Sequence, residues 1–400
     1  MIYIYLILVL STLLIRDTSV IDLIGIQWLY LSLINTLSLA YNFLKPARPF
    51  NCDKILKAII PLILIVFAIS CFNSTVIKLS LIDIARYFVI ILTVYNFLLF
   101  SGEKPINFLI ISRIFSIFLL IDILEFLFIY YQNFNNLIPR ASELKAFTSN
   151  ININAFIILL KIPFLFYLIL KDIKWIRILA FVILFISVYN LFWIQSRASF
   201  VALFSIFTIL VYINFQRNKK FIIYSLIILI SAFSLSNYHI SNNTNYSSSN
   251  VSRIASITDI SGEDESISSR LRYYKGGIQQ IKKTPIIGVG IGNWKINSIN
   301  YDRQYMDDYT VPYHMHNDFL QIFVETGLFG FLLYTCFFIY LFYILVNKII
   351  KEDFNVKTFI LLMCLITYVI DANLNFPHER SEIQSIFPLI IGLILYFEKK

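Results

Sequence analysis

The stretch of sequence that organises this chain is PYHMHNDFLQIFVETGLFG, residues 312–330. It opens with the polar side chains of His314, His316, Asn317 and Asp318 and passes without a break into an apolar run. Ionisable side chains are costly inside hydrocarbon, so a polar cluster at the mouth of an apolar helix is typical of chemistry at a membrane surface. The stretch therefore predicts a functional site where the chain enters a bilayer.

The whole 400-residue chain has the composition of a membrane protein. It is 58% hydrophobic and 14% charged, whereas soluble proteins have roughly 45–50% apolar and about 25% charged residues. Apolar runs of bilayer-spanning length recur throughout, and they fall at 2–15, 20–44, 55–72, 80–100, 106–131, 151–170, 174–194, 197–215, 221–236, 318–346, 357–371 and 383–397. They are too long for barrel strands. We therefore expect an all-α, polytopic membrane protein with about 12 transmembrane helices.

Basic residues in the short loops indicate the orientation of these helices. In an alternation of about 12 spans, most Lys and Arg fall on one side together with both termini, and the positive-inside rule makes that side cytoplasmic. The net charge of +9 then follows from topology rather than from binding of nucleic acid, which we do not expect as a partner. The outer side receives Arg197, the stretch 237–317 and the loop 372–382. We place the protein in a bacterial inner (plasma) membrane, with its site on the periplasmic or outer face.

The sequence divides into four segments. Residues 1–180 and 181–236 hold the N-terminal and central transmembrane helices, with Arg197 at the outer face of the central group. Residues 237–317 form a large outer loop, and residues 318–400 hold the C-terminal transmembrane helices.

The outer loop has two parts of different composition. The Asn/Ser-rich part, 236–252, is expected to be a flexible tether. The part at 268–284 is basic and has Leu271, Tyr274, Ile278 and Ile281 at helical spacing, so we expect an amphipathic helix on the membrane surface. The following GVGIGNW is expected to be a structural turn, because no GK[ST] follows it.

His314 and His316 allow three interpretations. With Asp318 they could bind a metal, but further ligands are not evident, since the other histidines are His239 and His378. They could belong to a solvated helix N-terminus, where Asp318 would interact favourably with the helix dipole. The third interpretation is a catalytic base. We expect neither a metal nor a cofactor.

Ionisable residues also interrupt the apolar runs. Asp83 and Arg86 are spaced to pair within one helix. Others lie in the fifth, sixth and eleventh spans, at Asp122, Glu125, Lys161 and Asp371. Such groups usually pair with one another or line a cavity. Structural pairing is the favoured interpretation over a proton or cation site.

Three separated motifs occur on the outer side in a fixed order. They are Ser196-Arg197-Ala198, then Arg270 through Tyr274 running into PIIGVGIGNW, and then His316-Asn317 followed by Glu325-Thr326-Gly327-Leu328-Phe329-Gly330. In order and spacing they resemble the O-antigen ligase and polymerase family of bacterial envelope glycosyltransferases. The resemblance covers roughly residues 180–335. The chain departs from the family pattern at Tyr274, where Trp is common.

The resemblance implies a function. Members of this family take a glycan from an undecaprenyl-diphosphate carrier and transfer it to an acceptor hydroxyl without a metal ion or a nucleotide sugar. The acceptor is lipid A-core in ligases and another lipid-linked repeat unit in polymerases. By resemblance, Arg197 and Arg270 contact the diphosphate and His316 is the base. Arg272 competes with Arg270 for the loop assignment.

The residue types suit this chemistry on their own terms. Guanidinium groups bind phosphate oxygens bidentately and stabilise the charge of a leaving diphosphate, and a histidine is a suitable base near neutral pH. We expect an inverting transfer with Asn317 orienting His316. Arg380 and Tyr274 are candidate glycan contacts, and Glu325 is expected to be structural.

Two alternatives stay open at this point. Within the same chemistry, the protein could be a repeat-unit polymerase of O-antigen or capsule rather than a ligase. A protein of a different class, an exporter or flippase of lipid-linked sugar, would explain the spans equally well. It gives no reason for a basic helix and a His-Asn pair on the outer side.

Overall fold

The structure is a computed structural model that describes residues 1–15, 22–45, 54–102, 105–133, 148, 150–214, 218–242, 249–257, 265–305, 313–352 and 355–398. These residues form helices and connecting segments and contain no strand. The long helices are α2 (Leu23–Leu44), α3 (Lys54–Ser70), α4 (Ile77–Ser101), α5 (Phe108–Asn133), α6 (Ile151–Lys171), α7 (Lys174–Ile194), α8 (Arg197–Asn214), α9 (Lys219–Ser241), α14 (Asp318–Lys351) and α15 (Val356–Leu374). The shorter ones are α1 (Ile2–Leu10), α10 (Asn250–Ala255), α11 (Glu265–Lys283), α12 (Trp294–Asn297), α13 (Ile299–Asp302), α16 (Ser381–Gln384) and α17 (Phe387–Glu398). Short 3-10 turns are η1 (Ser11–Leu14), η2 (Cys71–Asn73), η5 (Arg303–Tyr305) and η6 (Pro377–Glu379).

Each apolar segment expected from the sequence is helical, and the all-α polytopic fold is confirmed. Among the described residues, nine helical segments are long and apolar enough to cross a membrane. Two further helices, α4 and α5, are 25 and 26 residues long and carry charged residues, while Ile2–Leu14 is shorter.

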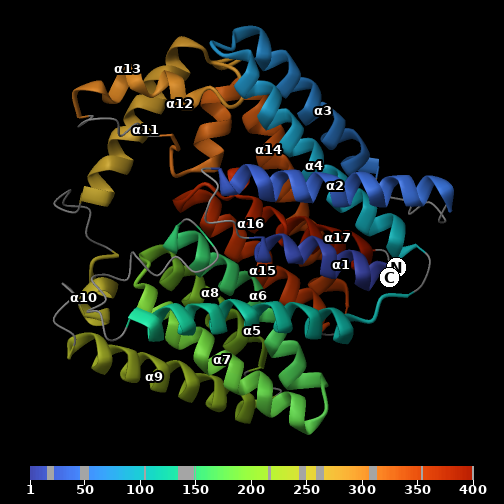
Figure 1. Ribbon diagram of the computed structural model, residues 1–400, viewed down its shortest axis with the longest axis vertical. Helices are drawn as coiled ribbons and strands as arrows, with labels where there is room; N and C mark the ends of the chain where they lie inside the picture. Colours follow the sequence, from blue (N-terminus) through green and yellow to red (C-terminus); the bar gives the residue numbers. More distant parts are fainter. Residues whose placement is uncertain are drawn as a thin grey trace.

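The long helices pack into one bundle with a separate group of short helices at one end. In Figure 1, α10 to α13 lie at the left edge of the bundle, and the N- and C-termini lie next to each other at the opposite edge. The described part of the loop 237–317 therefore lies at the far end of the molecule from both termini. Two helices are almost wholly enclosed: α6, which packs against α5, α7 and α15, and α17, which packs against α4 and α15.

Two of the ionisable groups' expected pairings are formed, whereas the buried Asp371 accepts a hydrogen bond from Asn375 Nδ2 at 2.7 Å. Lys161 of α6 forms an ion pair with Asp122 of α5, and both side chains are buried. On α4, Arg86 Nη1 lies 2.9 Å from Asp83 Oδ1. Removing one member of a buried pair leaves an uncompensated charge, so each pair fixes the packing of its helices.

The glycine-rich turn docks against a break in α14. At Gly327 the backbone has φ 70° and ψ −169°, which interrupts the helix. A Cβ at Gly327 would lie 2.0 Å from the backbone oxygen of Ile286, so only glycine fits there. The amide of Leu328 donates to the carbonyl of Pro285 at 2.9 Å. The turn that the sequence predicts is confirmed, and it is locked to α14.

Glu325 completes this junction. Its carboxylate accepts hydrogen bonds from the amides of Gly292, at 2.9 Å, and Trp294, at 3.0 Å. The carbonyls of Val324 and Glu325 accept from the amides of Val289 and Gly290. Glu325 is thus a structural residue, as expected, because its two carboxylate oxygens satisfy buried amides of the turn.

The helix expected at 268–284 exists but differs in detail. It begins three residues earlier, at Glu265, and ends at Lys283. The predicted apolar stripe divides, because Tyr274 and Ile281 pack inward on a small core around Trp294, whereas Leu271 and Ile278 are exposed. Periodicity alone could not show this, since the small residues Gly276 and Gly277 also face the core. Part of the expected tether is also ordered, because α9 continues to Ser241 and α10 begins at Asn250; residues 243–248 lie outside the described residues.

Candidate active site

His316 is held in an unusual backbone conformation at the entrance to α14. Its φ is 58°, in the left-handed region that non-glycine residues rarely adopt. The next residue, Asn317, is the N-cap of α14, and its side-chain oxygen accepts from the amide of Leu320 at 2.9 Å. Backbone strain of this kind persists where the surrounding structure enforces it, and it is often found at functional sites.

The structure places Asn317 differently from the sequence-based expectation. Its carboxamide was expected to orient the His316 side chain. Instead the oxygen caps α14, and the nitrogen donates to the carbonyl of Asn373 at 3.3 Å. Asn317 therefore fixes the backbone that carries His316, because capping polar groups bind orphan amides at a helix start.

The imidazole of His316 lies among aromatic rings. Phe376 approaches it edge-on with centroids 4.9 Å apart, and Tyr273 lies parallel at 6.4 Å. Its Nδ1 atom is buried without a hydrogen-bond partner among the described residues. Burial, followed by the positive charges of Arg270, His314 and Arg380, lowers the pKa of His316 to about 3. The ring is therefore neutral at physiological pH and has a lone pair available.

The basic helix α11 supplies two residues beside His316. Burial raises the pKa of Tyr274 and lowers that of His316, and the charge of Arg270 lowers the pKa of both groups. The Tyr274 hydroxyl donates to the backbone carbonyl of His316 at 3.1 Å, so Tyr274 holds the histidine main chain. Arg272 faces elsewhere, because its Nε lies 3.1 Å from Asp302 Oδ1 and ties α11 to α13.

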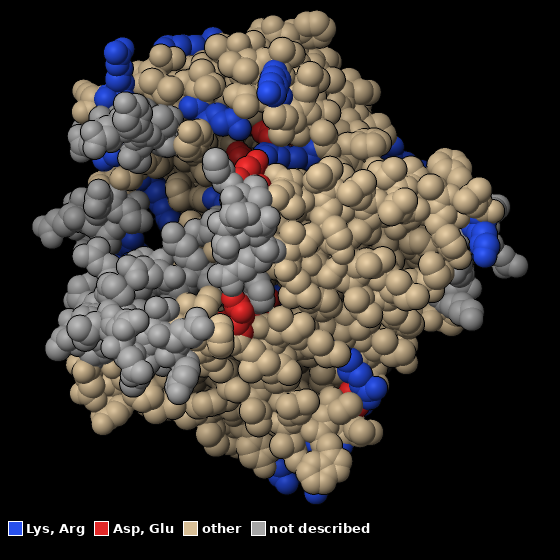
Figure 2. Space-filling view, in the orientation of Figure 1, with Lys and Arg blue, Asp and Glu red and all other residues tan. Residues whose placement is uncertain are grey.

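Arg197 is brought in from another part of the bundle. It is the first residue of α8 and is half-buried. Gln195, just before it, has φ 54°, and its carbonyl accepts from Arg253 Nε of α10 at 3.2 Å. Among the described residues, Arg197 makes no hydrogen bond to His316. On the side where α10 and α11 lie, the surface is hollowed and Lys and Arg side chains gather around the hollow (Figure 2).

A segment before α16 supplies the other wall of the site, which sequence reasoning largely missed. The ring of Phe376 stacks on His314 with centroids 4.0 Å apart. The guanidinium of Arg380 lies 4.6 Å from the centroid of the same Phe376 ring. The signal in the sequence was the charged and aromatic run NFPHERSE between two apolar segments, of which Arg380 alone was singled out.

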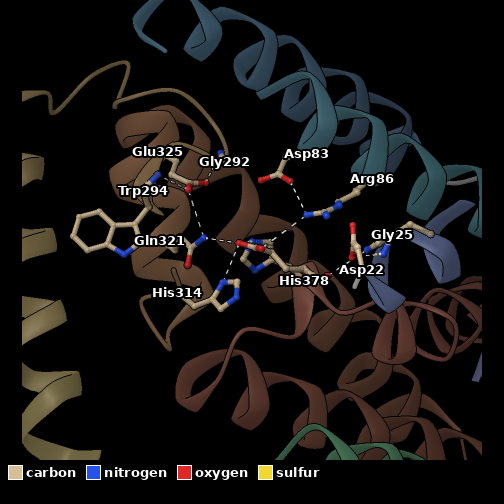
Figure 3. A network of polar contacts seen from close by, with 12 residues as sticks. Asp22, Gly25, Asp83, Arg86, Gly292, Trp294, His314, Gln321, Glu325 and His378 are labelled. Atoms are coloured by element: carbon tan, nitrogen blue, oxygen red, sulfur yellow. Dashed lines mark hydrogen bonds and ion pairs between the residues drawn. The ribbon is translucent and has the colours of Figure 1, made fainter. Parts of the chain in front are cut away.

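Glu379 is the centre of a buried network beneath this wall. Its Oε1 accepts from Gln321 Nε2 at 3.1 Å and lies 3.2 Å from His314 Nδ1. Arg86 Nη1 lies 3.9 Å from its other oxygen, and Trp28 donates to its backbone carbonyl. Figure 3 shows Arg86, Gln321 and His314 pointing toward one another beside His378. Although burial raises the pKa of Glu379, the charges of His314 and His378 hold it well below its usual range.

His378 also belongs to this network, and its environment is the opposite of that of His316. Its Nδ1 lies 2.6 Å from Asp318 Oδ1, and its amide donates to the other Asp318 oxygen at 3.2 Å. Burial lowers the pKa of His378, but the carboxylates of Asp318 and Glu379 outweigh it and raise the pKa to about 9. Asp318 is thus a buried ion-pair partner rather than a solvated residue at a helix terminus.

These contacts bear on the three interpretations of the His-x-His pair. His314 contacts Glu379 and Phe376, whereas His316 lies among rings and cations. No group of three or more metal-binding side chains exists in the described part of the chain. The arrangement can abstract a proton at His316 and can bind an anion beside it.

Comparison with known proteins agrees with this geometry. Residues 179–335 match the O-antigen ligase family. This segment is an O-antigen ligase domain. A curated relative, the exopolysaccharide production protein ExoQ of Rhizobium meliloti (strain 1021), is 26% identical over 141 residues. That alignment covers 34% of this chain and 31% of the relative, so the chain spans about a third of the length of the protein it matches.

The O-antigen ligase domain contains only part of the site. Arg197, Arg270 and His316 lie inside residues 179–335. Phe376, Glu379 and Arg380 lie beyond its end, and the fold returns them to the entrance of α14. The domain therefore provides the histidine and two of the arginines, while the last outer segment completes the surroundings of His316.

Proposed function

We propose that this membrane protein is a glycosyltransferase of surface-polysaccharide biosynthesis. It moves a glycan from an undecaprenyl-diphosphate carrier to an acceptor hydroxyl. The observation that carries the proposal is the neutral, unbonded imidazole of His316 with the cations Arg270 and Arg380 acting on it. The O-antigen ligase domain and the likeness to an exopolysaccharide production protein support the same assignment.

His316 is the general base of this reaction. The acceptor hydroxyl transfers its proton to the imidazole as its oxygen attacks the anomeric carbon, and the bond from that carbon to the diphosphate oxygen breaks. Attack opposite the leaving group inverts the configuration at that carbon. General-base assistance contributes on the order of 10²–10⁴ in rate.

The charges of Arg270 and Arg380 make the pKa of His316 depend on whether the donor is bound. In the ligand-free site their positive charge disfavours protonation of His316. A bound diphosphate offsets that charge, so the pKa of His316 rises when the donor is present. The histidine thus becomes a stronger base only in the complex that is ready to react.

Arg270 and Arg197 bind the diphosphate. Guanidinium groups bind phosphate oxygens bidentately and stay charged, which stabilises the leaving group as its charge develops. Arg197 stands at the N-terminus of α8, where backbone amides add to the attraction for an anion. Arg272 is engaged by Asp302 and has a supporting role in holding α11.

The acceptor decides between two enzymes of this chemistry. Transfer to lipid A-core would make the protein a ligase, and transfer to another lipid-linked repeat unit would make it a polymerase. A repeat-unit polymerase of O-antigen or capsule is the alternative to a ligase. An exporter needs neither a neutral base nor flanking cations at the entrance of α14.

We place the site on the outer face of the bacterial plasma membrane, with both termini in the cytoplasm. Support comes from the basic loops and from the separation of α10–α13 and the termini at opposite edges of the bundle (Figure 1).

The test is transfer by the purified full-length protein in detergent. A carrier-linked glycan and an acceptor glycan are supplied, and product, its anomeric configuration and released polyprenyl diphosphate are measured. We expect an inverted product and loss of about 10- to 100-fold in donor use for Arg270→Lys, since a point charge replaces a bidentate group. Arg303→Lys, an exposed residue of η5, is the matched control. Failure of the wild-type protein to consume any carrier-linked glycan would contradict the proposal.

A further inference from the structure

We propose that Arg380 binds the donor diphosphate together with Arg197 and Arg270, and that the ring of Phe376 holds the Arg380 guanidinium in place. The inference rests on the proposed function. It replaces the expectation that Arg380 contacts the glycan.

The first step is the position of the guanidinium. Arg380 Cζ lies 4.6 Å from the centroid of Phe376, and His314 is stacked on that ring at 4.0 Å with an interplanar angle of 12°. A ring stacked this closely fills one face, so the guanidinium occupies the other. The edge of Phe376 meets His316. Phe376 thus joins the cation directly to the surroundings of the base.

The second step is the charge of this pocket. The charges of Arg270 and Arg380 both lower the pKa of His316, and the charge of Arg86 lowers the pKa of Arg380. Burial and the charge of Arg86 lower the pKa of Arg380, while the carboxylates of Glu382 and Glu379 oppose them. Like charges held close together disfavour one another, and a bound anion relieves the repulsion. The pocket is therefore suited to a ligand with more than one negative charge.

The third step is the rigidity of the segment that carries Arg380. Its amide donates to the carbonyl of Pro377 at 3.1 Å, and its carbonyl accepts from the amide of Gln384 at 2.9 Å. Gln384 Nε2 also donates to the carbonyl of Pro377 at 2.9 Å. Trp28 donates to the neighbouring carbonyl of Glu379. A cation fixed in advance loses little freedom when it binds an anion.

The chemistry favours phosphate over sugar as the ligand of Arg380. A guanidinium has donors arranged to match phosphate oxygens, and it stacks readily on an aromatic ring. A guanidinium can donate to a sugar hydroxyl or to a phosphoryl oxygen, but only the phosphoryl oxygen also carries a negative charge that neutralises the buried cation. A third arginine adds contacts for a second phosphoryl group, so the site should discriminate a diphosphate from a monophosphate.

The direct test is binding of two short probes to the full-length protein in detergent. The probes are farnesyl diphosphate and farnesyl monophosphate, compared for wild type, Arg380→Gln and the control Arg303→Gln. We expect Arg380→Gln to weaken diphosphate binding by about 10- to 100-fold, the effect of one charge-assisted contact, and monophosphate binding much less. Diphosphate binding equal to wild type in Arg380→Gln would overturn the inference.

A second readout separates contact with substrate from a structural role. Removing the Arg380 cation removes one cause of the low pKa of His316. The acid limb of the transfer rate should therefore move to higher pH in Arg380→Gln. Added guanidinium ion should restore part of the activity of Arg380→Ala. An unmoved acid limb together with no rescue would contradict a role at the site.

A third variant covers the case in which Arg380→Gln does not fold. Phe376→Leu keeps the cation and removes its platform, and we expect diphosphate binding several-fold weaker, in line with a cation–π contact of about 1 kcal/mol. Unchanged binding in this variant would overturn the platform role. If the wild-type protein binds neither probe and transfers no glycan, the proposed function falls with the inference. If the wild type does both and the Arg380 variants match it, only the inference falls.

Discussion

Two histidines near the entrance of α14 show how the same side chain is used in two ways. His316 has no hydrogen bond to its ring among the described residues, and its pKa is lowered to about 3 by burial and by nearby cations. His378 is bonded to Asp318 at 2.6 Å, and its pKa is raised to about 9. The His316 ring is neutral and can accept a proton, whereas the His378 ring is charged and paired with Asp318.

The contrast separates the polar groups that hold the structure together from the one that is available to a ligand. The region of Glu325, Glu379 and His378 satisfies its charges internally, so it behaves as a scaffold. Near His316, the charges of Arg270 and Arg380 disfavour protonation of the ring, and among the described residues its Nδ1 atom has no hydrogen-bond partner. A site of that kind is completed by a ligand, because buried polar groups are otherwise paired.

The largest effect that would test this contrast is the loss of the proposed base. His316→Ala should reduce glycan transfer by about 10²–10⁴ while leaving the midpoint of thermal unfolding close to wild type. His239→Ala, a histidine on α9 that contacts Tyr189, is the matched control. Transfer at the wild-type rate by the His316 variant would show that the ring is not the base.

The complementary experiment concerns the paired histidine. His378→Ala leaves the buried Asp318 carboxylate without its partner, which should lower the free energy of unfolding by about 3–5 kcal/mol. Replacing both residues together with leucine should recover much of this stability, since an apolar pair is often tolerated where half an ion pair is not. Denaturant unfolding in detergent measures both. A His378→Ala variant as stable as wild type would contradict a structural role for the pair of His378 and Asp318.

A smaller effect is expected at Arg197. Arg197→Lys keeps the charge at the start of α8 but loses the bidentate geometry, so donor use should fall by about 10- to 100-fold. The measurement is the initial rate of transfer as a function of donor concentration. Wild-type rates would indicate that Arg197 anchors the helix end and does not bind the donor.

The pH dependence of stability should be opposite for the two histidines. The folded-state pKa of His378 is about 9, above the unfolded value near 6.5, so its stabilisation is complete below about pH 6.5 and is lost as the pH rises through 9. The pKa of His316 is depressed instead, so protonation of the unfolded chain lowers stability as the pH falls below about 6.5. Between neutral and alkaline pH the free energy of unfolding should fall more steeply for wild type than for His378→Ala. Parallel curves would contradict the pairing.

The smallest expected effect is that of a chelator. The proposed reaction uses an imidazole and guanidinium groups, so transfer in excess EDTA should equal transfer without it. Abolition of transfer by EDTA, with recovery on adding a divalent ion, would revive the metal interpretation of His314 and His316.

Much of the fold followed from local pattern. Long apolar runs require helices in a bilayer, and the structure has a helix at each of them. The roles of Glu325 and of the glycine turn were also accessible, because the turn and the break at Gly327 are specified by residue type. The side-chain contacts of the site were not accessible. The sequence left Arg272 as a competitor of Arg270, and the structure shows that Arg272 pairs with Asp302.

Residue pattern alone was enough to predict a helical membrane protein with a basic helix in the loop 237–317 and a histidine just before α14. The tertiary structure alone decided that Asn317 caps rather than orients, that Leu271 faces outward, and that Arg380 stacks beside His316. The physical reason is that periodicity and residue type fix each helix separately. The charge and availability of a buried side chain depend instead on what distant segments pack against it.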